Sequence, residues 1–306
     1  MLLVLEQTLN GLQFGVMLFL MAAGLTLVFG IMNLVNLAHG ALYMVGAYLA
    51  AWLFATTGNF PLAVVLALAG TLVVGVITEL VALRTLYERD HLDQVLATFG
   101  LILFFNEAVA MIWGRAALYM TLPARLSGHV QVLPGVNYPV YRALIILVGL
   151  VVALLLWLLV ARTRLGMLIR AGATNRTMVA ALGVNIRLLY TVVFGFGAAL
   201  AGLSGLMAGP IYAVEPGMGE QILIQVFVVI VIGGIGSIRG ALVGALVVGM
   251  VDTLGRAFLK PALSVMLSPT AAQSAGPALA SMLIYLLMAI VLSFRPQGLF
   301  PTARTR

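Results

Sequence analysis

Residues 139–161 read PVYRALIILVGLVVALLLWLLVA, an apolar run long enough to cross the ~30 Å hydrocarbon core of a bilayer as a helix. Its one charged residue, Arg142, lies near the start of the run. A strand of a membrane β-barrel would instead alternate apolar and polar positions over about ten residues. The run therefore predicts a transmembrane α-helix, and comparable runs recur along the chain.

The composition places the whole chain in the same class. Hydrophobic residues make up 63% of the 306 positions and charged residues 8%, with a mean hydropathy of +1.17, which exceeds what a soluble domain tolerates. The absence of cysteine excludes disulfides and thiolate metal sites. The net charge of +7 is distributed over the polar connections between apolar runs, so we expect no nucleic acid as a partner.

We therefore predict an all-α, polytopic integral membrane protein with about 8–9 transmembrane helices, some of them broken or re-entrant. The apolar runs lie near residues 9–31, 40–57, 61–83, 95–113, 139–161, 188–211, 222–235, 240–258 and 278–294. The runs at 222–235 and 240–258 are short or glycine-rich, so one of them is a candidate re-entrant segment. Residues 1–306 are predicted to form a single transmembrane domain, because no soluble domain is evident between the runs.

The basic segment Arg162–Arg187 follows the first run described and reads RTRLGMLIRAGATNRTMVAALGVNIR, with five arginines and no acidic residue. Positively charged connections between spans lie on the cytoplasmic side of the membrane. With this segment inside, the other basic residues inside are Arg84, Arg89, Arg239, Arg295, Arg304 and Arg306, and those outside are Arg115, Arg125, Arg142, Arg256 and Lys260. The majority of the basic residues thus lie inside, as the positive-inside rule requires.

Two stretches interrupt the apolar spans with small and polar residues: Gly30–Gly40 (GIMNLVNLAHG) and Gly233–Gly240 (GGIGSIRG). Backbone that leaves helical geometry at membrane depth must line a cavity or be buried in protein, and paired broken helices indicate a transport pathway. The candidate pathway residues here are Asn33, Asn36, His39 and Ser237. The alternative is that each interruption is a plain cytoplasmic turn. His39 either lines the pathway or hydrogen-bonds the broken backbone, and no nearby carboxylate or second histidine supports a metal site.

Ionisable residues within the apolar runs carry a cost of at least ~2.5–3.5 kcal/mol at the bilayer centre. Glu107 is predicted to lie deep in the fourth span, where it contacts a substrate ammonium or a partner permease, or is a hydrogen-bonded carboxyl between helices. Glu79 is expected to form a surface pair with Arg84. Asp252 and Arg256 are four residues apart, which predicts a structural helical pair.

Small residues recur every four positions in two places, which predicts smooth ridges for close helix packing. The two ridges are Ala201, Gly205 and Gly209, and Gly236, Gly240 and Gly244. They serve packing within the chain or, alternatively, a subunit interface.

Four ordered motifs resemble the LivH-type permeases of branched-chain amino acid ABC importers. They are Asn36-Leu37-Ala38-His39-Gly40 with Tyr43, Gly46, Ala47 and Tyr48; the block of Gly166, Arg170, Ala171, Asn175, Ala180, Leu182, Gly183 and Asn185; Gly233-Gly234-Ile235-Gly236-Ser237 with Gly240 and Gly244; and Arg295-Pro296-Gln297-Gly298-Leu299-Phe300. The resemblance covers nearly the whole chain. Many relatives have glutamate where this chain has Ala41, which leaves the substrate open.

The resemblance implies a permease subunit of the bacterial inner (plasma) membrane. Its partners would be a second, homologous permease, two ATP-binding cassette subunits and an extracytoplasmic binding protein. The sequence has no G-x-x-x-x-G-K-[ST] phosphate loop, so this chain is expected to bind no cofactor and to be no enzyme, with ATP and Mg held by the partner ATPases.

Arg162–Arg187 would then couple to the ATPase through a short helix near Thr177–Leu182 that ends at Gly183. The candidate coupling residues are Arg164, Arg170, Asn175, Arg176 and Gly183. The alternative is a basic amphipathic loop that rests on anionic membrane lipid, to which each arginine contributes about 1 kcal/mol.

Other functions stay open at the level of the sequence. A secondary transporter would use an ion gradient and would need no docking segment. A membrane-embedded enzyme would need a nucleophile and base or a metal cluster, and the three histidines are scattered over different regions. The expected substrate is a branched-chain or related hydrophobic amino acid, with urea, short amides or small carboxylic acids as alternatives within the same family.

Overall fold

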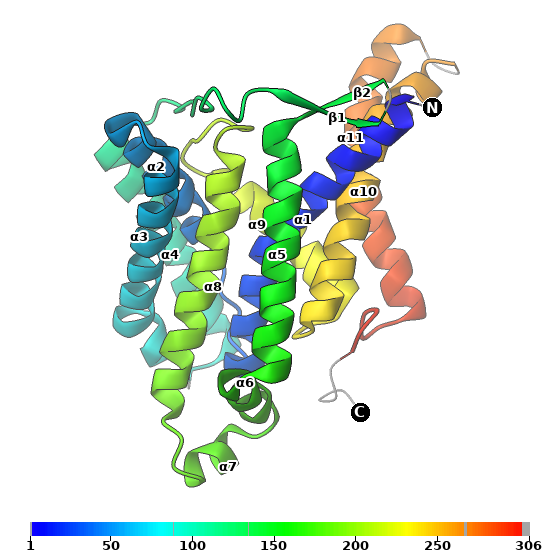
Figure 1. Ribbon diagram of the computed structural model, residues 1–306. Coiled ribbons are helices and arrows are strands. Elements are labelled where there is room, and N and C mark those ends of the chain that lie inside the picture. The colour runs from blue at the N-terminus through cyan, green and yellow to red at the C-terminus, as the bar shows by residue number, and fades with distance from the viewer. Residues whose placement is uncertain (1, 88, 134, 266–267, 302–306) are drawn as a thin grey trace. The chain divides into compact units, whose positions relative to one another are not determined.

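The computed structural model describes residues 2–87, 89–133, 135–265 and 268–301, and nearly all of its regular structure is helical (Figure 1). The basic residues Arg304 and Arg306 lie outside the described residues. The helices are α1 (Leu2–Met32), α2 (His39–Thr57), α3 (Phe60–Val81), the 3-10 helix η1 (Leu83–Leu86), α4 (His91–Trp113), α5 (Val140–Arg162), α6 (Arg164–Thr174), α7 (Arg176–Ala181), α8 (Ile186–Ala208), α9 (Met218–Gly233), α10 (Ile238–Leu263) and α11 (Pro269–Phe294). The prediction of an all-α polytopic protein is confirmed.

Each of the nine predicted apolar runs corresponds to one helix, and in the described part of the chain eight of these are long and apolar enough to cross a membrane. The exception is α9, whose 16 residues span about 24 Å at 1.5 Å per residue, less than the ~30 Å hydrocarbon core. The run at 222–235 is therefore the shorter of the two candidates for a re-entrant segment, because α10 has 26 residues.

The chain divides into two compact units. The chain passes from one unit to the other within α1, α5 and α9 and in the connection after α4. Unit 1 contains Met1–Phe19, Ala124–Leu150 and Val226–Arg306, and unit 2 contains Leu20–Pro123 and Val151–Gln225. The predicted single transmembrane domain stays a prediction. Each unit is described by itself below.

In unit 2, helices α2, α3 and α8 pack against one another through glycines. A Cβ atom on Gly46 of α2 would overlap the backbone of Gly202 in α8, and a Cβ on Gly205 would overlap the carbonyl oxygen of Tyr43. A Cβ on Gly202 would also lie 2.7 Å from Cγ2 of Thr71 in α3. The three helix backbones therefore approach as closely as small-residue ridges permit. Gly205 serves packing within the chain, as one of the two alternatives predicts.

In unit 1, the first part of α1 packs closely on α10, and α10 packs on α11. A Cβ on Gly11 would lie 3.1 Å from Cα of Met250, and one on Gly15 would lie 3.0 Å from Cα of Leu246. Asp252 and Arg256 of α10 form the predicted helical pair, with Arg256 Nε 2.9 Å from Asp252 Oδ2.

The C-terminal segment of unit 1 returns to the end of α9. The backbone N–H groups of Leu299 and Phe300 donate to the carbonyl oxygens of Ile232 and Gly233, at 2.9 and 3.0 Å. Gly298 has a φ of +79°, and a Cβ there would lie 2.6 Å from Cα of Gly234. These bonds satisfy carbonyl groups that a helix end otherwise leaves unpaired. Two motifs far apart in the sequence, GGIGSIRG and RPQGLF, thus form one structure.

Some predicted boundaries and one member of a predicted ridge are wrong. Helix α10 extends to Leu263 and α11 begins at Pro269, so the connection between the predicted runs 240–258 and 278–294 is much shorter than expected. Helix α11 begins early because Ser268 caps it, accepting a hydrogen bond from Ala271 N at 3.4 Å. Gly236 has a φ of +82° and lies before α10, so it is not part of the predicted helical ridge.

A small hairpin was not predicted. Strands β1 (His129–Leu133) and β2 (Val136–Pro139) pair antiparallel, with Val130 opposite Tyr138. The alternation in HVQVL and the Pro-Gly dipeptide at 134–135 are sequence signals for such a hairpin. Tyr138 is almost fully buried, and this burial raises its pKa to about 12.

Candidate transport pathway and coupling segment

The basic segment between α5 and α8 folds into two short helices, α6 and α7. Each helix start has a polar side chain that accepts a backbone N–H: Thr163 Oγ1 from Gly166 at 3.1 Å, and Asn175 Oδ1 from Met178 at 3.0 Å. Asn185 caps α8 in the same way. The sequence prediction included α7 but not α6, although Thr163 is a recognisable cap signal.

The predicted end of the short helix is confirmed. Helix α7 stops at Ala181, and Gly183 follows with a φ of +85°, donating its N–H to Ala180 O at 3.0 Å. Glycine adopts this left-handed conformation without a steric penalty. The turn reverses the chain and leads it directly into α8.

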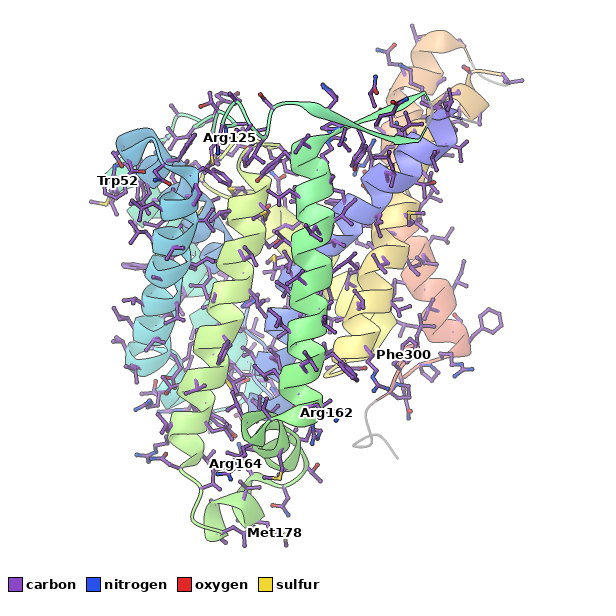
Figure 2. All side chains as sticks on the ribbon, viewed as in Figure 1. Trp52, Arg125, Arg162, Arg164, Met178 and Phe300 are labelled. Carbon is purple, nitrogen blue, oxygen red and sulfur yellow. The ribbon has the colours of Figure 1, made fainter. Side chains whose placement is uncertain are left out.

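The candidate coupling residues are exposed on this segment. Arg164 and Arg176 occupy the first positions of α6 and α7, and Asn175 is the exposed cap between them. Arg170 is also exposed, and its guanidinium donates to the carbonyl oxygen of Val160 in α5. Figure 2 shows Arg162 at the lower end of α5 and Arg164 and Met178 further down, with Met178 near the tip of the segment. The segment combines exposed positive charge with an exposed apolar tip.

The first predicted helix break is present between α1 and α2. Asn33 directly follows the last residue of α1 and has a φ of +55°. Its N–H donates to Phe29 O at 3.0 Å, and its side chain is exposed. Asparagine is one of the few residues that tolerate this conformation. The chain then runs without helix until His39, the first residue of α2.

Two polar side chains of this break are buried without a hydrogen-bond partner among the described residues. They are Asn36, through both its side-chain oxygen and nitrogen, and His39, through both ring nitrogens. A Cβ on Gly24 would lie 3.0 Å from His39 Nε2, so the ring packs against α1, with the backbone of Met21 as a polar neighbour. One alternative predicted that His39 hydrogen-bonds the broken backbone. Its backbone N–H does donate to Asn36 O, at 3.4 Å, whereas its ring nitrogens make no hydrogen bond to that stretch. Buried polar groups without partners are uncommon and require a ligand, a water or a second conformation.

A close contact near His39 was not predicted. The first turn of α2 meets the first turn of α9: a Cβ on Gly40 would lie 2.9 Å from the carbonyl carbon of Gly219. The two glycines are 179 positions apart in the sequence, so no local pattern indicates the contact. The start of α9 therefore belongs to the surroundings of the first break.

Ser237, in the second break, caps α10. Its Oγ accepts a hydrogen bond from Gly240 N at 3.1 Å, and the residue is half-buried. Gly240 packs against Gly233 of α9, because a Cβ on Gly240 would lie 2.6 Å from the Gly233 carbonyl carbon. Ser237 thus has a structural role in addition to the predicted pathway role, which stays a prediction.

The placement of Glu107 differs from the prediction. It lies within the last two turns of α4, with 61% of its side chain exposed, and its Oε2 is 2.7 Å from Nη2 of Arg115. The arginine neutralises the carboxylate, so Glu107 is not an unpaired charge within the membrane helix. Beside it, Asn106 donates to Glu220 in the first turn of α9. A pathway role for Glu107 remains a prediction.

The pairing of Glu79 with Arg84 is confirmed, with Arg84 Nη2 3.3 Å from Glu79 Oε2, but the description of a surface pair is wrong. The Glu79 carboxylate is fully buried and also accepts from Tyr87 and Thr191. The hydroxyl of Thr191, on α8, is 112 residues distant and could not be anticipated from local spacing.

The eight candidate spans, the two helix breaks and the exposed basic segment define a polytopic helical membrane protein with the features of a transport permease. Residues 7–292 match the family described as the permease component of branched-chain amino acid transport systems, and the chain belongs to this family. The predicted localisation, a multi-pass protein of the inner membrane, agrees with this family.

Three named relatives illustrate the similarity. The chain is 32% identical to the high-affinity branched-chain amino acid transport system permease protein BraD of Pseudomonas aeruginosa, over 96% of this chain and 95% of that protein. It is 31% identical to LivH of Escherichia coli K12, over 83% of this chain and 87% of that protein. It is 28% identical to a probable LivH of Methanocaldococcus jannaschii, over 78% and 76%. No solved structure matches the chain significantly.

Proposed function

We propose that the chain is the membrane permease subunit of an ATP-driven importer for branched-chain or related hydrophobic amino acids, forming half of the translocation pathway. The family supports the amino acid class, since the named relatives are permeases of branched-chain amino acid transport systems. Urea, short amides and small carboxylic acids stay as alternatives, since an external binding protein would select the substrate. The proposed partners are a second homologous permease, two ATP-binding cassette subunits, which hold ATP and Mg, and an extracytoplasmic binding protein.

The observation that carries the proposal is the segment Arg162–Arg187. It forms two capped helices with exposed arginines and an apolar tip at Met178 and Leu182, which are 63% and 78% exposed. An apolar tip suits insertion into a groove of a protein partner. Apolar side chains beside arginines also suit insertion into a membrane interface, so the tip alone does not separate the two alternatives. The family, whose named relatives are permeases of transport systems, favours docking on an ATPase over a lipid-bound loop.

The double charge reversal of Arg170→Glu and Arg176→Glu tests this docking. We expect substrate-stimulated ATP hydrolysis in the reconstituted importer to fall at least about tenfold, because a loss of about 1.4 kcal/mol already changes a binding constant by that factor. The permease should remain in the membrane, since both residues are exposed. The measurement is ATP hydrolysis and subunit copurification from gently solubilised membranes.

The matched control reverses two exposed arginines outside the segment and outside both breaks, Arg89→Glu and Arg125→Glu, and should leave both readouts close to wild type. Survival of assembly and of stimulated hydrolysis in the Arg170/Arg176 variant would remove the docking assignment. Transport by the isolated chain in vesicles, driven by an ion gradient without ATP, would instead identify a secondary transporter.

The buried, unpartnered side chains of the first break support a place for Asn36 and His39 on the pathway. Cysteine at the exposed position Asn33 should react with a small water-soluble thiol reagent in every state. Asn36→Cys should react only when the break opens, so its labelling rate should change with nucleotide in the assembled importer. Ser237→Cys should likewise be labelled, because Ser237 is half-buried in the second break.

The chain contains no native cysteine, so labelling reports the introduced residue alone. Thr98→Cys is the matched control, since Thr98 is fully buried in α4 and belongs to neither break, and it should stay unlabelled. If Asn36→Cys were as inert as Thr98→Cys in every nucleotide state of folded protein, the first break would not line the aqueous pathway.

A further inference from the structure

The most highly connected buried charge in unit 2 is the carboxylate of Glu79, near the end of α3. It accepts hydrogen bonds from Arg84 Nε and Nη2 at 3.4 and 3.3 Å, from the Tyr87 hydroxyl at 2.7 Å and from Thr191 Oγ1 at 2.8 Å. A buried carboxylate is tolerated only where such partners compensate for its lost hydration. Burial of the charged Glu79 side chain therefore depends on Arg84, Tyr87 and Thr191 together.

The partners are also bonded to one another. Arg84 Nη2 donates to Thr191 Oγ1 at 2.9 Å, so the hydroxyl joins the arginine and the carboxylate. Burial, followed by the hydrogen bond to Glu79, raises the pKa of Tyr87 well above its usual value near 10. A tyrosine phenol is protonated at physiological pH even at its usual pKa, and the raised pKa keeps Tyr87 a donor beside the carboxylate.

The network joins elements that are distant in the sequence. Glu79 belongs to α3, Arg84 to η1, Tyr87 to the turn after η1, and Thr191 to α8. The ring of Tyr87 meets that of Tyr190 edge-on, with centroids 5.2 Å apart. The start of α8 is thus fixed to the end of α3 and to the connection that leads into α4.

Tyr190, beside this network, also contacts the end of α1, which α6 of the coupling segment contacts as well. The hydroxyl of Tyr190 donates to Ile31 O, at 3.4 Å, near the end of α1 and two residues before Asn33. A Cβ on Gly172 of α6 would lie 3.2 Å from Ile31 Cδ1, so α6 packs directly on the same residue. Ile31 therefore meets α6 and Tyr190, and it belongs to the last turn of α1, directly before the break.

We propose that Glu79, Arg84, Tyr87, Tyr190 and Thr191 form a positioning cluster that transmits movement of the coupling segment to the break between α1 and α2. The inference rests on the proposed ATP-driven function, because it assigns a role in coupling. Conformational coupling passes through contiguous packed and hydrogen-bonded groups, and here these groups link α6 and α8 to α3 and the end of α1. The cluster residues are positioning residues and touch no substrate.

The deciding variant is Thr191→Val, which removes the hydroxyl between Arg84 and Glu79 but leaves the carboxylate paired with Arg84 and Tyr87. In the assembled importer in lipid vesicles, the measured quantity is the amount of amino acid transported per ATP hydrolysed. We expect Thr191→Val to lower this ratio by about threefold to thirtyfold. Thr191→Ser retains the hydroxyl and should restore the ratio. Glu79→Gln should lower it as well.

Thr78→Val is the matched control, because the buried Thr78 hydroxyl, one residue before Glu79, donates to Val74 O within its own helix. It should leave the ratio unchanged. The proposal is overturned if Thr191→Val transports as much per ATP as Thr78→Val, or if Thr191→Ser, which retains the hydroxyl, fails to restore the ratio. Failure of the wild-type importer to hydrolyse ATP on adding substrate-loaded binding protein would instead refute the proposed function itself.

Discussion

Gly205→Ala is expected to deplete the membrane of folded protein. The added Cβ would overlap the carbonyl oxygen of Tyr43 and lie 2.8 Å from its carbonyl carbon and 3.2 Å from Ala47 N. All three are backbone atoms of α2, so the helix itself would have to move away from α8. An added group in a packed core costs about 1–3 kcal/mol, and a backbone obstacle places this substitution at the upper end. Thermal stability and yield in mild detergent measure the effect.

Gly100→Ala provides the control for Gly205→Ala. Gly100 also lies within a membrane helix, α4, but a Cβ there meets no atom within 4 Å. Alanine is the better helix former by about 0.5–1 kcal/mol, so this variant should be at least as stable as wild type. Equal yields of the two variants would contradict the close packing of α2 on α8.

Gly166→Ala should leave the protein inserted in the membrane but remove its coupling to ATP hydrolysis. A Cβ at Gly166 would overlap the carbonyl oxygens of Leu159 and Val160 and lie 2.6 Å from Val160 Cα. Helix α6 would have to swing away from α5, breaking the Thr163 cap and the bond from Arg170 to Val160 O. We expect substrate-stimulated ATP hydrolysis to fall by about tenfold or more, as for the loss of a docking contact.

The control for Gly166→Ala is Gly128→Ala, in the connection before β1, where the nearest atom to a Cβ is Val140 Cγ2 at 3.9 Å. It should show wild-type assembly and hydrolysis. Normal coupling in Gly166→Ala, with the same amount of protein in the membrane, would show that the position of α6 does not matter for the ATPase.

The long helices and one short helix were predictable because their signals are local. Apolar runs of about 20 residues require a helix in lipid, and Gly183 after a short helical pattern predicts the left-handed turn observed there. The pair of Asp252 and Arg256 was predictable in the same way, from spacing within one helix.

The surroundings of the candidate site were not predictable, because they depend on contacts between distant segments. The buried state of Glu79 follows from Thr191 and Tyr87, and the crowding beside His39 follows from Gly219. Glu107 was expected to be embedded, but Arg115, beyond the end of the helix, turns back to pair with it. Hydropathy predicts which residues belong to a membrane helix. It does not predict which side chain of another segment each of them contacts.

The bonds from Leu299 and Phe300 to the end of α9 set an order of events during biosynthesis. Ile232 and Gly233 leave the ribosome before α10 and α11, whereas their partners are translated after both of these helices. At ~5–20 residues per second, α9 enters the bilayer several seconds before the groups that complete its last turn exist. A nascent chain therefore holds an unfinished α9 until α11 has been inserted, and the second break closes last.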